Sequence, residues 1–251
     1  MGFLAALRFL TSIPLPLKRE PSPEELGRSV PYFPLVGLII GLILAGLNWL
    51  LRLVLPPMVV DALIIAALVI ITGALHLDGF ADTCDGIAGH KDVEDRWRVM
   101  RDSRAGAFGI VGIVMLLLVK YVSLSSIPET VMMATLLFMP MASRWAMVYA
   151  IFVYPYARPS GLGKVFKQGT RWAGFTVATI IIVVVAVVLI PLFGLSGIVV
   201  ILGVWVITAI FAAYLKSKFS GLTGDTYGAI NEVAEVFALI LILLLVRLGL
   251  A

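Results

Sequence analysis

The chain has 251 residues, of which 61% are hydrophobic and only 14% are charged, and its formal net charge is +4. Because a soluble domain carries about 25% charged residues, this composition excludes an ordinary water-soluble protein, and we expect no nucleic-acid partner. The single cysteine, Cys84, excludes an intramolecular disulfide framework. The composition therefore predicts an all-α integral membrane protein, with residues 1–251 forming a single polytopic membrane domain.

The first 31 residues predict an interfacial segment. Met1 to about Ile13 has the pattern of an amphipathic helix lying on the membrane, and Pro14 and Pro16 end it. A polar linker follows and leads to the first long apolar run.

Seven apolar runs are long enough to span a bilayer, since a span needs about 20 apolar residues. In the first of them, Gly37, Gly41 and Gly46 form a seam of small residues where another helix can approach closely. The predicted spans cover approximately residues 32–55, 59–75, 108–124, 131–153, 172–192, 197–215 and 229–248.

The connecting segments alternate between basic and uncharged. Most of the 19 lysines and arginines lie before the first span, between spans two and three, between four and five, and between six and seven. The other three connections carry none. Because positive loops face the cytoplasm, the pattern predicts a cytoplasmic N-terminus in the cell membrane. The hydrophilic segment 78–104, which includes an expected short helix over 92–102, and the polar loop 154–170 are then cytoplasmic.

The hydrophilic segment opens with three aspartates. Asp78, Asp82 and Asp85 stand at positions i, i+4 and i+7, so on a helix their carboxylates share one face. Like charges at this spacing repel one another, and near a bilayer they are costly to desolvate. A divalent cation would relieve the repulsion, and oxygen ligands suit Mg²⁺ or Mn²⁺. The alternative is a solvated helix end whose acids only mark the membrane boundary.

Groups that bind phosphate fall on the same predicted side. Arg101, Arg104, Arg144 and Lys164 could hold phosphate oxygens, and Asp102 could add a further carboxylate to the metal site. Metal, cations and a carboxylate that accepts a proton together are typical of phosphoryl-type transfer.

A second segment rich in glycine precedes the seventh span and contains Gly224 and Asp225. Its backbone amides could approach a phosphate closely. Glu232 and Glu235 follow within the span itself. Arg144 lies inside the fourth predicted span and therefore needs a carboxylate, a phosphate or a wet cavity. The two glutamates are candidate metal ligands, a candidate base or simply the partners of Arg144, and His76 is better placed for a supporting hydrogen bond than for metal ligation.

Taken together, these segments resemble the cobalamin synthase (adenosylcobinamide-GDP ribazoletransferase) family. The resemblance extends in order over essentially the whole chain. It is carried by Phe33-Pro34-Leu35-Val36-Gly37, His76-Leu77-Asp78-Gly79-Phe80-Ala81-Asp82-Thr83-Cys84-Asp85-Gly86, Met100-Arg101-Asp102-Ser103-Arg104-x-Gly106, Ser143-Arg144 and Gly221-x-Thr223-Gly224-Asp225-Thr226-x-Gly228-Ala229.

The resemblance implies a Mg²⁺-dependent transferase that joins adenosylcobinamide-GDP to α-ribazole, or to its 5′-phosphate, and releases GMP. A ribose hydroxyl of the acceptor attacks the phosphorus nearest cobinamide. By position, the metal ligands are Asp78, Asp82, Asp85 and Asp102, with the last three also candidates for catalysis. Phosphate contacts fall to Arg101, Arg104, Arg144, Gly224 and Asp225.

An ion-coupled membrane transporter is the alternative function, because acids and an arginine within a helical bundle also suit a cation or proton pathway. The aspartates, however, cluster at one predicted rim rather than at mid-membrane, and no pair of spans forms an inverted repeat. The sequence leaves the oligomeric state open, a homo-oligomer included.

Overall fold

The computed structural model describes residues 2–16, 19–88, 92–102 and 104–250. Met1 of the predicted N-terminal helix and Ser103 of the Met100–Gly106 string lie outside these residues. Across the described residues the secondary structure is helical, apart from one isolated bridge between Tyr156 and Leu222. The predicted all-α class is confirmed.

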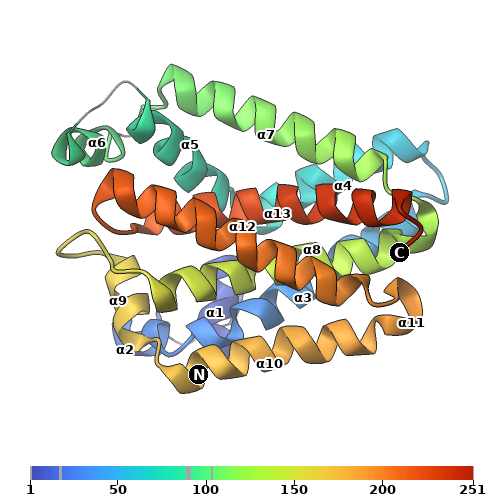
Figure 1. Ribbon diagram of the computed structural model, residues 1–251, viewed down its shortest axis with the longest axis horizontal. Helices are drawn as coiled ribbons and strands as arrows, with labels where there is room; N and C mark the ends of the chain where they lie inside the picture. The colour runs from blue at the N-terminus through green and yellow to red at the C-terminus, as the bar shows by residue number, and fades with distance from the viewer. Residues whose placement is uncertain (1, 17–18, 89–91, 103, 251) are drawn as a thin grey trace.

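Long helices run along the longest axis of the molecule (Figure 1). Five segments are long and apolar enough to cross a membrane, and the number rises to seven if each of two bent helix pairs counts as one span. The five are η1 with α3 (Val30–Leu51), α7 (Ala107–Ser125), α8 (Glu129–Val153), α12 (Ser196–Phe219) and α13 (Gly224–Arg247). The chain is therefore a multi-pass membrane protein by the length and composition of its helices.

Helix α8 forms the centre of the bundle. It packs against α3 (Phe33–Leu51), α10 (Trp172–Val188), α12 and α13, and most of its side chains are buried. Part of the predicted glycine seam of α3 lies directly against α8, since a Cβ atom at Gly41 would lie 2.6 Å from the carbonyl oxygen of Leu136. Gly46 meets no neighbour. Close packing of backbones is the usual basis of helix association in membranes.

The second predicted span ends earlier than expected and bends. Helix α4 (Pro57–Ile71) meets α5 (Leu75–Ile87) at 88°, through left-handed conformations at Gly73 and Ala74. The hydroxyl of Ser12 donates to the carbonyl of Ile70 at 2.7 Å, so the N-terminal segment satisfies an end carbonyl of α4. The bend turns α5 away from the direction of α4, and α5 packs against α7 and α13.

The connecting elements gather at two opposite ends of the bundle. Helices α2 (Pro23–Gly27), α6 (Val93–Val99) and α9 (Leu162–Gly169) lie at one end, whereas α11 (Ile190–Phe193) and the C-terminus lie at the other (Figure 1). Helix α1 (Gly2–Leu10) corresponds to the predicted interfacial helix, and α6 is shorter than the helix predicted over 92–102. Which end faces the cytoplasm stays a prediction.

The expectation of a polar loop over 154–170 is wrong, because α9 occupies its second half. Phe166 is buried and packs edge-on against Phe9 and Phe33, with ring centroids 4.7 and 5.6 Å away. An apolar face pointing at α1 and α3 therefore holds this segment as a helix, at 91° to α10.

Candidate active site

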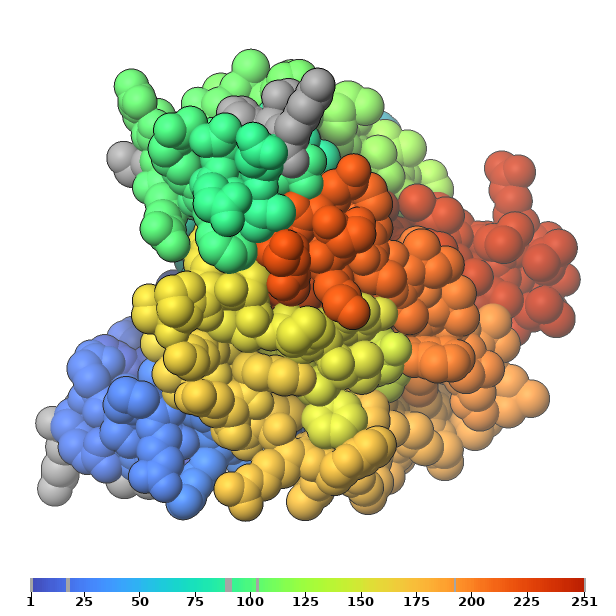
Figure 2. All heavy atoms as spheres, turned by 60° about the vertical axis from the view of Figure 1, so that its left-hand side comes forward, coloured from blue at the N-terminus to red at the C-terminus, as the bar shows by residue number. Residues whose placement is uncertain are grey.

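Three segments that are distant in sequence meet at the end of the bundle that carries α6 and α9. They are α5, the loop 154–161 and the start of α13; Figure 2 shows the neighbouring surfaces of residues near 100, 160 and 220 on one face. Two backbone hydrogen bonds join the loops. Ala157 donates to the carbonyl of Leu222, and Leu222 donates to that of Pro155, each at 2.8 Å. Gly221, at φ 142°, takes a conformation that favours glycine at this junction.

Helix α5 lies directly against the start of α13. A Cβ atom at Gly79 would stand 2.7 Å from the carbonyl oxygen of Asp225, and one at Gly228 would stand 3.1 Å from that of His76. Thr223 caps α13, because its hydroxyl accepts from the amide of Thr226 at 3.2 Å. This contact sets the acids of α5 beside the N-terminus of a 24-residue helix.

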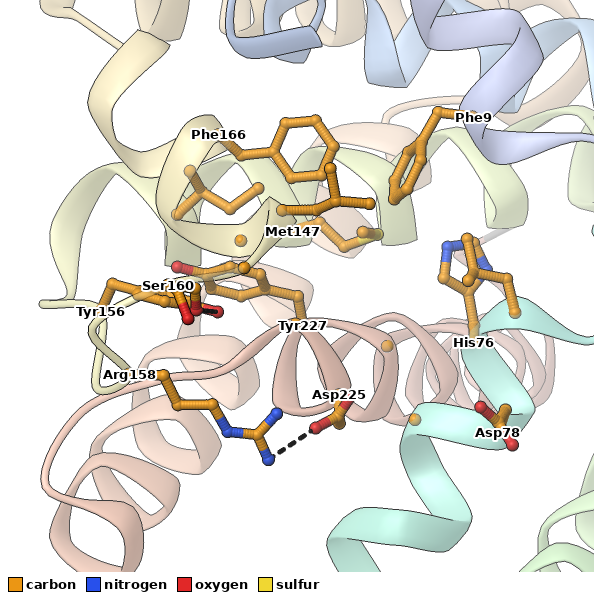
Figure 3. A pocket seen from close by; sticks show the side chains of 18 residues that line it. Phe9, His76, Asp78, Met147, Tyr156, Arg158, Ser160, Phe166, Asp225 and Tyr227 are labelled. Atoms are coloured by element: carbon orange, nitrogen blue, oxygen red, sulfur yellow. Dashed lines mark hydrogen bonds and ion pairs between the residues drawn. The ribbon is translucent and has the colours of Figure 1, made fainter. Parts of the chain in front are cut away.

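A cavity of about 270 Å³ opens between these elements (Figure 3). Its apolar wall includes Phe9, Met147 and Phe166, and the polar side carries the pair of Arg158 and Asp225. The lining is completed by Leu75, His76, Asp78, Gly79, Ile151, Tyr156, Ser160, Gly161, Leu162, Gly163, Gly224, Tyr227 and Gly228. The cavity thus combines aromatic and ionic surfaces, as small-molecule sites do.

Arg158 is the cationic group of this cavity, and the sequence reasoning did not single it out. Its guanidinium lies 3.1 Å from the carboxylate of Asp225, and both side chains are largely buried. The signal that could have found it is its position in a basic loop on the same predicted side as the aspartates. Lys164, a candidate phosphate contact from the sequence, instead donates to the carbonyl of Pro159 at 2.6 Å.

Asp78 and Asp82 lie one helical turn apart on α5, the first exposed and the second half-buried. Burial, followed by the negative charges of Asp225, Asp78 and Asp85 in that order, raises the pKa of Asp82 to about 7, against the opposing effect of Arg158. A cation beside these carboxylates would relieve their mutual repulsion.

Asp85 faces a different neighbour. Its two carboxylate oxygens accept hydrogen bonds from the amides of Gly106 and Gly109, each at 2.8 Å, so Asp85 caps the N-terminus of α7. Asp85 also lines a second, shallower cavity together with Asp102 and Arg104. Its carboxylate thus fixes α7 against α5.

Asp102 and Arg104 form a pair of exposed side chains. The guanidinium of Arg104 donates to Asp102 at 2.7 and 3.0 Å, and this bond, with that from the Arg104 amide, lowers the pKa of Asp102 to about 2. Arg101 is exposed beside them. The structure therefore does not bring Asp102 into the cavity that contains Asp78 and Asp225.

Arg144 is fully buried in a network of charges inside the bundle. It donates to Glu235 and, at 3.0 Å, to Ser143, while Lys120 contacts Glu232 and Glu235 at 2.5 Å each. None of the four charged residues is among those that line the cavity. The sequence left a carboxylate, a phosphate or a wet cavity open as the partner of Arg144, and the structure shows the carboxylate of Glu235. Glu232 and Glu235 do not line the cavity that contains Asp78 and Asp225.

Within the described residues, no group of three or more His, Cys, Asp or Glu side chains is arranged to hold a metal ion. The four-aspartate metal site therefore stays a prediction. Asp78 and Asp225 line the same cavity, and Mg²⁺ commonly uses only one or two protein carboxylates together with waters and substrate phosphates. The acids present fit a cation of that kind better than a site made of protein ligands alone.

Comparison with known proteins identifies the family of the chain. The family model described as cobalamin-5-phosphate synthase matches residues 2–243. A protein of Geotalea daltonii named adenosylcobinamide-GDP ribazoletransferase is 41% identical over 237 residues, covering 94% of each chain. Proteins of the same name from Desulforamulus reducens and Pseudomonas syringae are each 37% identical, over 95% and 98% of this chain and 94% and 100% of their own.

No solved structure matches the chain. The sequence matches nevertheless extend over nearly its full length, and they include the segments that build the cavity. The chain belongs to the cobalamin-5-phosphate synthase family.

Proposed function

We propose that this protein is an adenosylcobinamide-GDP ribazoletransferase that acts on α-ribazole or its 5′-phosphate. A ribose hydroxyl of the acceptor forms a new bond to the phosphorus nearest cobinamide, the phosphoanhydride bond to the second phosphate breaks, and GMP leaves. The observation that carries the proposal is the cavity that joins Asp78, Asp225 and Arg158 beside the N-terminus of α13.

The residues of this cavity suit a pyrophosphate. The guanidinium of Arg158 can donate two parallel hydrogen bonds to phosphate oxygens, and the first turn of α13 carries partial positive charge. Gly224 supports close approach of a phosphate, because no neighbour lies within 4 Å of where its Cβ would stand. Asp225 holds Arg158 in position.

A divalent cation, Mg²⁺ or Mn²⁺, completes the site in this proposal. Asp78 and Asp225, which line the cavity, would hold it together with phosphate oxygens of the substrate. When bound, the cation supplies charge neutralisation at the pyrophosphate oxygens. Asp82 lies one turn from Asp78 on α5 and is the candidate to accept the proton of the attacking hydroxyl. The contacts of Asp85 with Gly106 and of Asp102 with Arg104 do not support a catalytic role for either aspartate.

The active site faces the cytoplasm in this proposal, because the connections that carry most of the lysines and arginines lie at the same end as the cavity. The buried network of Lys120, Arg144, Glu232 and Glu235 is the observation that favours a cation- or proton-coupled transporter instead. Its opposite charges pair with one another, however, and its members do not line the cavity.

One experiment distinguishes the transferase from the transporter. Wild-type protein in liposomes is given adenosylcobinamide-GDP and α-ribazole with Mg²⁺ or with a chelator, and both GMP and ion flux across the liposome membrane are measured. We expect GMP only with Mg²⁺ and both substrates. Ion flux without GMP formation would support the transporter and contradict the transferase.

A further inference from the structure

Two buried polar side chains of the cavity lack hydrogen-bond partners. His76 and Tyr227 are each 2% exposed. Neither ring nitrogen of His76 nor the hydroxyl of Tyr227 has a partner among the described residues. An unsatisfied buried polar group costs about 1–3 kcal/mol, so such groups in a cavity indicate a ligand that supplies the missing hydrogen bonds.

The wall opposite the ion pair is apolar and aromatic. Figure 3 shows Phe9, Met147 and Phe166 on the side of the cavity away from Arg158 and Asp225, with the ring of His76 near Phe9. The rings of Phe9 and Phe166 already contact each other edge-to-face, with centroids 4.7 Å apart. A flat aromatic group suits such a wall, because aromatic pairs add to the energy of apolar burial.

The hydrogen-bonding atoms of His76 and Tyr227 limit what they can bind. The imidazole ring of His76 has two nitrogens that can donate or accept hydrogen bonds. Tyr227 adds a hydroxyl that both donates and accepts. Together they match a ligand with a few polar atoms on a mainly apolar body.

The size of the cavity limits the ligand further. A volume of about 270 Å³ lies near the lower end of small-ligand pockets, at about 300–1,000 Å³, so the cavity cannot enclose a corrinoid ring. Guanine carries donors and acceptors around most of its edge, and the apolar wall would leave several of them unpaired. The smaller, less polar acceptor of the transferase reaction fits both limits.

From these contacts we infer that the aromatic side of the cavity binds the N-heterocyclic base of the riboside acceptor, with His76 and Tyr227 donating hydrogen bonds to polar atoms of the bound riboside. This inference rests on the proposed transferase function. It makes His76 and Tyr227 residues that determine acceptor specificity, and it places the acceptor sugar toward Arg158 and Asp225, where the pyrophosphate is proposed to bind.

Steady-state kinetics of two conservative variants test the inference. In His76→Gln and Tyr227→Phe we expect the KM for α-ribazole to rise about tenfold, the change that corresponds to 1.4 kcal/mol, with the KM for adenosylcobinamide-GDP nearly unchanged. Tyr154→Phe is the matched control, because the Tyr154 hydroxyl donates to the carbonyl of Ala209 at 2.8 Å and Tyr154 does not line the cavity. It should keep both KM values.

The outcomes distinguish failure of this inference from failure of the proposed transferase function. If the wild-type protein forms no GMP, the proposed function fails and the inference falls with it. If the wild type is active and both variants keep the acceptor KM, or raise the donor KM instead, only the assignment of the base is overturned. Should a variant not fold, inhibition of the wild type by benzimidazole alone decides: inhibition competitive with α-ribazole supports the inference, and no competition overturns it.

Discussion

The backbone of Gly79 lies against that of Asp225, so that a Cβ at position 79 would stand 2.7 Å from the Asp225 carbonyl oxygen and 3.0 Å from its Cα. No side chain fits between α5 and α13 at this point. The contact fixes how far the carboxylates of α5 stand from the pair of Arg158 and Asp225. The geometry of the candidate site therefore depends on one residue that carries no functional group.

Replacing this glycine should separate the two helices. We expect Gly79→Ala to reduce the free energy of unfolding by about 1–3 kcal/mol, as overpacking does, and to lower GMP formation more than tenfold by displacing Asp78 from Asp225. Thermal unfolding in detergent and the GMP assay measure the two effects. Gly46→Ala is the control, because nothing lies within 4 Å of that position, and it should be neutral or slightly stabilising. Full activity of Gly79→Ala would contradict the role of this contact.

The elements that sequence reasoning predicted well are those with a strong local pattern. The apolar runs, the N-terminal amphipathic helix and the helix carrying Asp78, Asp82 and Asp85 are all present, because hydrophobic length and periodicity determine them locally. The 88° bend between α4 and α5 was not predicted, since it depends on a left-handed Ala74 and on Ser12, which lies 58 residues from its partner Ile70.

Arg158 should be essential for binding the pyrophosphate. In Arg158→Ala we expect kcat/KM to fall by about 10²-fold or more, with Arg158→Lys intermediate, because a preorganised guanidinium is lost from the site of developing charge. Steady-state GMP release measures the change. Arg98→Ala is the matched control, since Arg98 is 76% exposed and pairs with Asp95 on the same short helix. Equal activity of Arg158→Ala and wild type would limit Arg158 to a structural role.

Asp82 should make the metal-free protein less stable at higher pH. Its folded pKa of about 7 exceeds the ordinary value, so between about pH 4 and 7 the folded protein holds a proton that the unfolded chain has released. Raising the pH through this range therefore favours unfolding, and Asp82→Asn should remove that slope. Thermal unfolding of both proteins from pH 5 to 8 with a chelator tests this. Parallel curves for the two would contradict it.

The charge network within the bundle should serve stability. Glu235 contacts both Lys120 and Arg144, so Glu235→Gln leaves two buried cations with one carboxylate, Glu232, and should cost about 3–5 kcal/mol of unfolding free energy. Glu129→Gln, which breaks a pair with Arg52 at a side chain 65% exposed, should cost less than about 1 kcal/mol. A Glu235→Gln protein that is as stable as wild type but inactive would place the network in catalysis instead.

Among the functional residues, local spacing could be predicted from the sequence and long-range partners could not. The spacing of Asp78 and Asp82 is local and visible in the sequence, whereas the partners of Arg158, Arg144 and Asp85 come from distant segments. Asp85 has the same spacing as the other two aspartates, but its carboxylate caps α7, because Gly106 and Gly109 present their amides to it. Residue type and spacing identify candidates; the assembled helices decide which neighbour each candidate meets.

In the proposed reaction the protein joins two substrates at this cavity with loss of GMP. The most direct measurement is the ratio of GMP to joined corrinoid formed by purified wild-type protein in liposomes with Mg²⁺, adenosylcobinamide-GDP and α-ribazole. We expect a ratio of one, with neither product formed when α-ribazole is omitted. GMP released without the acceptor, or a folded wild-type protein that forms neither product, would contradict it.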